Sequence, residues 1–340
     1  MSGANFYHIT SEGKMQETKT PSEAMNSAKK GDFVWLNYYK PEKDDLLPLA
    51  GLLGLHSLSI EDCFDKDQIP KIEDFPENTF ILFNSFTYAD RKLFIEEIDL
   101  FIGENFVVSV SGLGHDKGNI LSGIERSVEI AGESLKLGPA FLLHVIIDHI
   151  VDKKFTAIEA LEEELDAAED KMLLNVSGFD PALILRLRRD LLSLRKSLFH
   201  EREILVRICR KDFPFIGEKT IFLYRDIYDH LVKSFELTET CRDIVTSLME
   251  IYLSLLNNQM ALAANETNIS VRRLTLITTV FMPMTLIAGV GGMSEWSMMT
   301  GPENWKLSYT LFMLAMLVMG AANYYLLKWL ERKDKKSARP

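Results

Sequence analysis

The chain has 340 residues, of which 47% are hydrophobic, and its acidic residues outnumber its basic residues by 49 to 38, which gives a formal net charge of −11. This balance argues against nucleic-acid binding, which needs a basic surface, and suits a protein that meets cations. The sequence holds no phosphate-binding loop, paired CxxC or GxSxG motif, so we do not expect an enzyme. The three cysteines have no metal-ligand spacing and indicate reduced thiols in a cytosolic body.

Residues 1–135 predict a cytoplasmic α/β domain with a mixed sheet. Segments rich in β-branched and aromatic residues predict strands at 32–37, 79–88, 94–102 and 105–111. Helices are expected at 44–54, 57–64 and 119–131. The apolar content is sufficient for a separate core.

Residues 136–212 predict a helical hairpin, because strong helix formers are interrupted once, at 175–181. Asp180 is expected as the N-cap of the second helix and Pro181 as its first residue. The first helix carries an acidic run at 159–170 and the second carries a basic set. These charges either pair across the hairpin or, in the alternative interpretation, concentrate cations near a pore mouth.

The first hairpin helix also carries two histidines and two aspartates at helical spacing. His144 and Asp148 share one face, as do Asp148 and Asp152, while His149 lies beside them. Zinc can use such spacing, and an exposed polar surface is the alternative.

Residues 213–273 predict a long stalk helix. The sequence contains no helix breaker from Glu218 to the first apolar segment, and apolar residues recur every three or four positions. We therefore expect one helix over residues 218–292 with a coiled-coil-like seam. Polar interruptions of this seam at Ser234, Gln259 and Glu266 favour a wide bundle with a wet axis.

Two apolar segments near the end of the chain predict transmembrane helices at 274–293 and 307–327. They are separated by a short external loop at 294–306 and followed by a basic tail at 328–340. Basic residues flank the pair at the two ends remote from the loop, so the positive-inside rule predicts a multi-pass protein with both termini in the cytoplasm. The membrane is expected to be the inner membrane of the cell.

Polar and small residues recur along one face of the first transmembrane segment: Thr275, Thr278, Met282, Thr285 and Gly289. Such a face suits the wall of a water-filled pore. In the alternative, the threonines bond to their own helix carbonyls and the glycine permits close helix packing. Two spans cannot enclose a pore, so the pore interpretation requires a ring of protomers.

The segment TTVFMPMTLIAGVGGMS resembles the first span of the CorA family of divalent-cation channels. Three further segments resemble the family in the right order: residues 55–62, residues 224–230, and Asn265 with Asn268 before the span. Membership would imply a homopentameric funnel: an α+β cytoplasmic domain, a long stalk helix and two C-terminal transmembrane helices. Its partners would be further copies of the chain, membrane lipid and divalent cations.

The resemblance also implies site residues. The pore and selectivity residues would be Asn268, Val271, Leu274, Thr278, Met282, Thr285, Gly289, Gly292, Met293 and Ser294. Regulatory metal ions would lie between protomers, with Asp62 of one facing Asp226 of the next and with Glu61 and Asp148 close by.

One signature differs from the family. This chain has Gly292-Met293-Ser294 where the family has Gly-Met-Asn, and serine presents a shorter polar group than asparagine. The resemblance to the family implies passive transport of magnesium, with cobalt and nickel as further ions, gated by cytoplasmic magnesium. The alternatives are a zinc transporter of the same superfamily and a membrane-anchored metal sensor that does not conduct.

Overall fold

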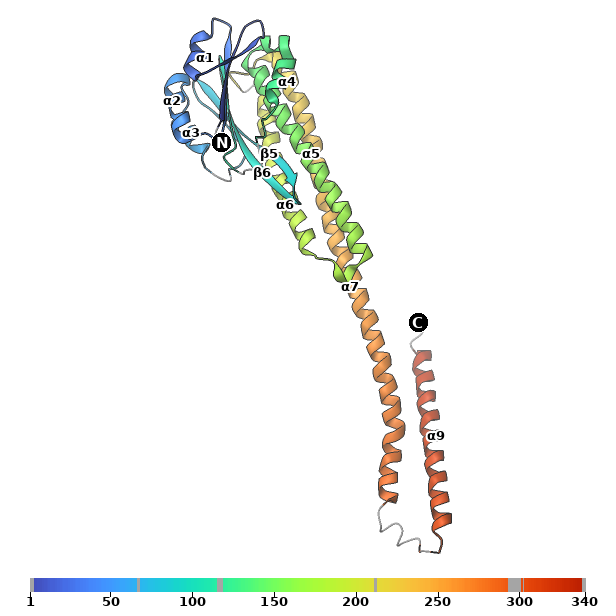
Figure 1. The fold of residues 1–340 in the computed structure, drawn as a ribbon. Helices are drawn as coiled ribbons and strands as arrows, with labels where there is room; N and C mark the ends of the chain where they lie inside the picture. Colours follow the sequence, from blue (N-terminus) through green and yellow to red (C-terminus); the bar gives the residue numbers. More distant parts are fainter. Residues whose placement is uncertain are drawn as a thin grey trace. The chain divides into compact units, whose positions relative to one another are not determined.

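The computed structural model describes residues 3–65, 68–114, 119–210, 213–292, 301 and 303–337, with side chains described as far as Trp329. Its contacts divide the chain into two compact units, Met1–Tyr252 and Leu253–Pro340 (Figure 1). Helix α7 contributes to both units, and each unit is considered separately below.

The first unit is built on a seven-stranded sheet with the strand order β2-β1-β3-β7-β6-β5-β4. Neighbouring strands are antiparallel except β3 and β7, which are parallel, with Trp35 opposite Val107. The strands are β1 (Gly3–Ile9), β2 (Met15–Thr18), β3 (Phe33–Tyr39), β4 (Lys71–Asp74), β5 (Asn78–Ala89), β6 (Lys92–Gly103) and β7 (Phe106–Ser111).

Three short helices cover one face of the sheet: α1 (Pro21–Ser27), α2 (Lys43–Leu53) and α3 (Ser57–Asp62). Their apolar side chains, among them Leu46, Leu49 and Ile60, form one buried cluster with Phe80 and Val108 of the sheet. Successive side chains of a strand point to opposite faces of the sheet, so the strand residues of this cluster are separate from those on the opposite face.

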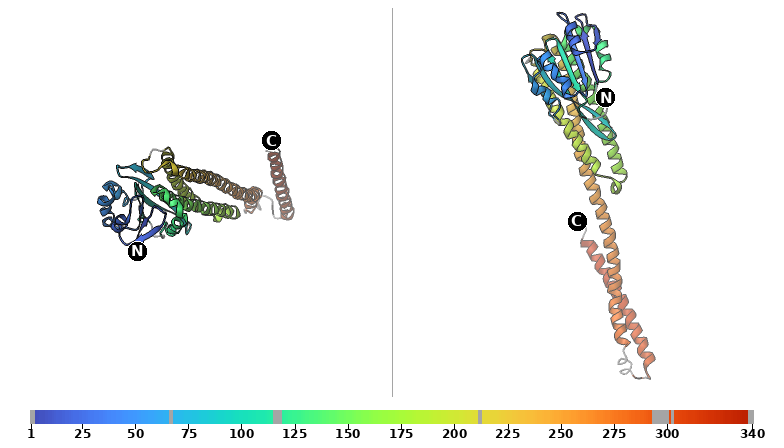
Figure 2. Two further views of the ribbon diagram at one scale, coloured as in Figure 1. Left: turned by 90° about the horizontal axis from the view of Figure 1, so that it is seen from above. Right: turned by 60° about the vertical axis from the view of Figure 1, so that its left-hand side comes forward.

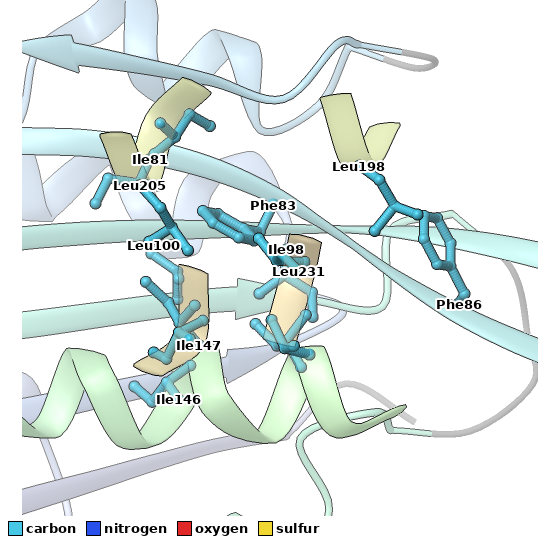
Figure 3. Packing of buried hydrophobic residues seen from close by; sticks show 14 of the residues in the cluster. Ile81, Phe83, Phe86, Ile98, Leu100, Ile146, Ile147, Leu198, Leu205 and Leu231 are labelled. Atoms are coloured by element: carbon cyan, nitrogen blue, oxygen red, sulfur yellow. The ribbon is translucent and has the colours of Figure 1, made fainter. Parts of the chain in front are cut away.

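The opposite face is covered by α4 (Ile124–Ala131), α5 (Pro139–Leu174), α6 (Ala182–Cys209) and the first part of α7 (Glu218–Gly291). Ile146 and Ile147 of α5, Leu198 of α6 and Leu231 of α7 meet Phe83 and its neighbours (Figure 3). The α5–α6 hairpin and α7 therefore share one core with the sheet.

The expected hairpin is confirmed, with small differences at its ends. The structure starts α6 at Ala182, so the expectation that Pro181 is its first residue is wrong by one position, and the Asp180 carboxylate accepts a hydrogen bond from Ala182 N–H at 2.9 Å. Helix α4 begins at Ile124, because residues 120–123 form turns. The predicted pairing across the hairpin is partial: Glu164 lies 3.8 Å from Arg186, whereas Arg195 of the basic set pairs with Glu239 of α7.

A fully buried ion pair joins α5 and α6 beneath the sheet. Lys154 and Glu201 are both 0% exposed and form a salt bridge. Glu201 also accepts hydrogen bonds from Asn84 N–H at 2.9 Å and from Ser197 at 3.3 Å. The Lys154 ammonium lies 5.0 Å from the centre of the Phe83 ring. Burial raises the pKa of Glu201 and lowers that of Lys154, while each partner opposes this effect on the other.

A second buried carboxylate organises the β1–β2 turn. Asp32 accepts hydrogen bonds from Ser11 N–H at 2.8 Å, from Lys29 N–H at 3.1 Å and from His8 Nε2 at 2.9 Å. Burial alone would raise the pKa of Asp32, but the hydrogen bonds outweigh it and lower the pKa to about 2.

The second unit contains the remainder of α7 and α9 (Trp305–Ser337), which lie beside each other in Figure 1 and cross in the right-hand view of Figure 2. The helices approach closely at glycine. A Cβ atom on Gly320 would lie 3.2 Å from Met284 Sδ, and one on Gly291 would lie 2.6 Å from the Phe312 ring. Small residues at these contacts let two helix backbones pack tightly. Pro283 lies inside this part of α7.

Candidate functional site

Two acidic side chains of α5 and a histidine of α7 form a group that could hold a metal ion. Asp148, Asp152 and His230 each offer a ligand atom, and these atoms lie within 4.8 Å of one another. Burial raises the pKa of Asp148, and the charges of Asp152 and Asp226 act in the same direction, while His230 opposes them. A divalent cation would remove this repulsion, and the mixed oxygen and nitrogen ligands suit magnesium less well than zinc or cobalt.

The two histidines of α5 have surroundings different from those of His230. The His144 ring lies 5.8 Å from the Phe141 ring and 5.9 Å from the Tyr224 ring, and burial lowers its pKa. His149 contacts the carbonyl oxygen of Ile120 at 3.2 Å. Of the four residues in the sequence pattern, Asp148 and Asp152 thus belong to the acidic group, whereas His144 and His149 support the fold.

His230 was not predicted as a ligand. It lies four residues after Asp226 on α7, a spacing that places both on one helix face, but its proximity to Asp148 depends on how α5 packs on α7. The only available signal was the presence of a second acid-and-histidine pair in the segment 224–230.

The predicted intersubunit ligands Glu61 and Asp62 each form a salt bridge with a lysine of the same protomer. Lys71 Nζ lies 2.5 Å from Asp62 Oδ2, and Lys43 Nζ lies 3.2 Å from Glu61 Oε1. The group of ligand atoms around Asp148 includes neither acid, and Asp226 is exposed. Within one protomer Glu61 and Asp62 are thus paired with lysines, and their bridge between protomers remains a prediction.

The long helix changes character along its length. In the first unit its seam is buried from Tyr224 to Leu248, and Ser234 lies within this buried part. From Leu253 to Gly291 its described side chains are exposed or half-buried, including Asn268 and Val271. The expectation that Ser234 lines a wet axis is therefore wrong, because that stretch packs against the protomer's own sheet and hairpin.

The predicted pore face of α7 lies away from α9. At about 100° per residue, Met284 and Gly291, which contact α9, point in directions about 20° apart. The predicted face is turned about 100–160° from Met284; it consists of Thr278, Met282, Thr285 and Gly289. Met282 is 71% exposed, and no heavy atom lies within 4 Å of a Cβ built on Gly289. A shallow groove runs along Met282, Thr285 and Gly289 of this face.

The threonine hydroxyls of this face bond to their own helix. Thr278 donates to the carbonyl oxygen of Leu274 at 2.9 Å, and Thr285 donates to that of Phe281 at 2.9 Å. This matches the packing alternative, yet each hydroxyl oxygen retains lone pairs that can accept from water. Leu274 is 64% exposed on the same side. Gly292 lies in the last described turn at the end of α7, whereas Met293 and Ser294 lie outside the described residues.

The second unit offers two helices long and apolar enough to cross a membrane, α7 and Trp305–Trp329. Together with the α/β unit and its acidic group, they are typical of a membrane protein with a large polar domain that could bind cations. The sequence matches the profile described as "CorA-like Mg2+ transporter protein" over residues 30–332. The chain therefore belongs to the CorA family.

Individual relatives agree with this assignment. The chain is 31% identical over 291 residues to the cobalt/magnesium transport protein CorA of Thermotoga maritima, covering 84% of this chain and 79% of the relative. A more distant relative, the zinc transport protein ZntB of Yersinia enterocolitica, is 21% identical over 93% of both chains. The solved CorA magnesium transporter of Methanocaldococcus jannaschii shares the fold, with a TM-score of 0.69, 23% identity, and coverage of 95% and 96% of the two chains.

The chain is thus a divalent-cation transporter of the CorA family, and members of this family are ion transporters rather than enzymes. The predicted α+β domain, long helix and C-terminal helices are confirmed as the family fold.

Proposed function

We propose that five copies of this chain form a ring that conducts magnesium, together with cobalt and nickel, down the electrochemical gradient. The observation that carries this proposal is the face of Thr278, Met282, Thr285 and Gly289, which α9 leaves uncovered. Mixed polar and small residues on a face turned from α9, the other candidate span among the described residues, suit a wet interior.

Transport of this kind needs no energy-coupling motif. An inward-negative potential favours entry of a divalent cation by about 4.6 kcal/mol per 100 mV. Magnesium gives up its water reluctantly, so neutral oxygens that address the hydrated ion suit it best. Threonine hydroxyls and the carbonyl oxygens near Gly292 are such groups, and Val271, Leu274 and Met282 would form the hydrophobic constriction.

Gating would come from acids of neighbouring protomers. Asp62 of one protomer would face Asp226 of the next, with Glu61 and Asp148 nearby, and their repulsion would be relieved by bound magnesium. Loss of magnesium would separate the protomers and let the constriction fill with water. In support, Asp226 is exposed and acts electrostatically on Asp148. An Asp226→Ala variant should lose magnesium protection of the first unit against protease, and unchanged protection would remove Asp226 from the sensor.

The orientation follows from charge. Both termini would lie in the cytoplasm of a cell with an inner membrane, because basic residues precede the first span and follow the apolar segment of α9. The acidic groups of the first unit would then sample the cytosolic ion concentration.

The test is uptake by the full-length protein in liposomes, measured for magnesium, zinc, cobalt and nickel. Thr285→Val should slow magnesium uptake several-fold, because the hydroxyl is lost from the proposed pore wall. Thr310→Val of α9 is the matched control, since Thr310 also bonds to its own helix, to the Lys306 carbonyl oxygen at 2.7 Å, and its uptake should be unchanged.

A Ser294→Asn variant tests the altered signature and should increase selectivity for magnesium. Absence of uptake of every ion by both the parent protein and this variant would refute the channel and favour a sensor that does not conduct. Zinc uptake that depends on a proton gradient would favour the zinc transporter instead.

A further inference from the structure

A cavity of about 530 Å³ lies at the end of the α5–α6 hairpin, beside the turn that joins β5 to β6 (Figure 1). Four basic residues line it: Arg91, Lys171, Arg186 and Arg189. Asp180 is the only acidic side chain among the described residues that line it. A chain with a net charge of −11 thus gathers positive charge at one cavity, and none of these residues has a role in the proposed pore or gate.

The carboxylates of the protomer neutralise these cations only in part. Arg91 Nε lies 3.5 Å from Glu164 Oε1 and Arg186 Nη2 lies 3.8 Å from the same oxygen, so two guanidinium groups share one carboxylate. Among the described residues, Lys171 and Arg189 form no salt bridge or side-chain hydrogen bond, although Arg189 acts electrostatically on Asp190. The wall of the cavity therefore carries an excess of positive charge.

Two details indicate that the arginines serve a ligand. Arg186 Nε and Nη2 are buried, yet neither has a hydrogen-bond partner in the described part of the chain. A buried charged donor without an acceptor is costly, which indicates that water or an anion completes its surroundings. Arg91 has a φ of 58° in the two-residue turn between Ala89 and Lys92, where glycine is the favoured residue. An arginine in this conformation suggests a role for its side chain.

The composition of the wall defines the chemistry of the ligand. Guanidinium groups bind phosphate through two parallel hydrogen bonds, and an ammonium group binds it as a point charge. Four cations match the several negative charges of linked phosphate groups better than the single charge of a carboxylate. The cavity has the volume of a small-molecule site. Phe179, whose ring lies 5.7 Å from that of Tyr252, and Leu183 add an apolar surface to the wall.

We propose that this cavity binds a soluble molecule with linked phosphate groups, such as a nucleoside triphosphate. The phosphates bind Lys171, Arg186 and Arg189, and the base contacts Phe179. Asp180 accepts a hydrogen bond from Ala182 N–H at 2.9 Å, so its charge stays at the site and opposes the anion. Because Phe179 also contacts Tyr252 of α7, an occupied cavity restrains the end of the hairpin against the long helix.

The proposal does not depend on ion conduction, so it is tested by calorimetric titration of the full-length protein in detergent, without a transport assay. The probes are ATP and inorganic tripolyphosphate, in EDTA so that metal ions do not bind the phosphates. We expect both to saturate at one molecule per chain and to bind more weakly as the salt concentration rises. Short-chain phosphatidic acid is the lipid probe, and its displacement of ATP at equal concentration would overturn the assignment to a soluble molecule.

Lys171→Gln and Arg189→Gln should each weaken the affinity for ATP about tenfold. Arg188→Gln is the matched control and should bind as the parent protein does, because Arg188 is the exposed neighbour on α6 and does not line the cavity. Asp180→Asn should bind ATP several-fold more tightly, since an amide oxygen still caps the helix while the opposing charge is lost.

Circular dichroism of each variant reports whether it is folded. Absence of saturable binding of both ATP and tripolyphosphate by the parent protein would overturn the proposal. Unchanged affinity in a folded variant that combines Lys171→Gln with Arg189→Gln would overturn it too, as would an equal loss in Arg188→Gln.

Discussion

The buried pair of Lys154 and Glu201 permits a quantitative prediction. Lys154→Met keeps an unbranched apolar side chain of similar length but leaves the Glu201 carboxylate inside the core without its cation. Removing one member of a buried ion pair costs about 3–5 kcal/mol. The carboxylate would retain its hydrogen bonds from Asn84 and Ser197, so we expect a loss near the lower end, about 3 kcal/mol. That corresponds to a shift of roughly 100-fold in the folding equilibrium.

The assay is urea denaturation of the full-length protein in detergent, followed by circular dichroism, with Lys153→Met as the control because Lys153 is the exposed neighbour on the same helix. A second variant combines Lys154→Met with Glu201→Gln, which removes the buried charge while an amide oxygen still accepts from Asn84. This double variant should regain at least half of the loss. The reasoning fails if the single variant loses less than about 1 kcal/mol, or if the double variant is less stable than the single one.

Three further predictions concern other contacts. Lys71→Gln should increase the apparent magnesium affinity in protease-protection assays several-fold, because the lysine competes with cations for Asp62; an unchanged or weaker affinity would contradict this. Gly320→Leu should destabilise the α7–α9 pair by about 1–3 kcal/mol, measured as a lower melting temperature in detergent, whereas Gly289→Ala should not, because Gly289 has open space around it. Asp32→Asn should make the loss of stability on acidification less steep. The depressed pKa of Asp32, about 2, stabilises the fold above about pH 4, and this contribution disappears as the pH falls towards 2. An equally steep loss of stability in the variant would refute this role of Asp32.

The long periodic segments could be predicted closely from the sequence. Helix α7 was expected at 218–292 and is found at Glu218–Gly291, because an uninterrupted apolar spacing of three to four residues leaves no other regular structure. The strands of the central sheet were predicted for a similar reason. Strands β1, β2 and β4 were not predicted, because their sequences, GANFYHI, MQET and KIED, lack clear alternation and are held by pairing with neighbouring strands.

The candidate site was only partly predictable. Asp148 was identified from helical spacing, but His230 joins it through the packing of α5 on α7, which no local pattern encodes. The proposed contact between Asp62 and Asp226 would join two copies of the chain, so it cannot be read from one protomer.

Pro283 gives the apolar part of α7 a specific chemical requirement. Proline has no N–H, so the carbonyl oxygen of Thr279 cannot receive the usual backbone hydrogen bond from four residues ahead. The Thr279 hydroxyl does not compensate, because it donates to the carbonyl oxygen of Thr275 at 2.7 Å. In a hydrocarbon environment such an oxygen needs a donor from water or from a neighbouring helix. Adjacent to Met282, the helix thus carries a hydrogen-bond acceptor, the Thr279 carbonyl oxygen, that belongs to the backbone and not to a side chain. Only a substitution of Pro283 itself would supply its missing backbone donor.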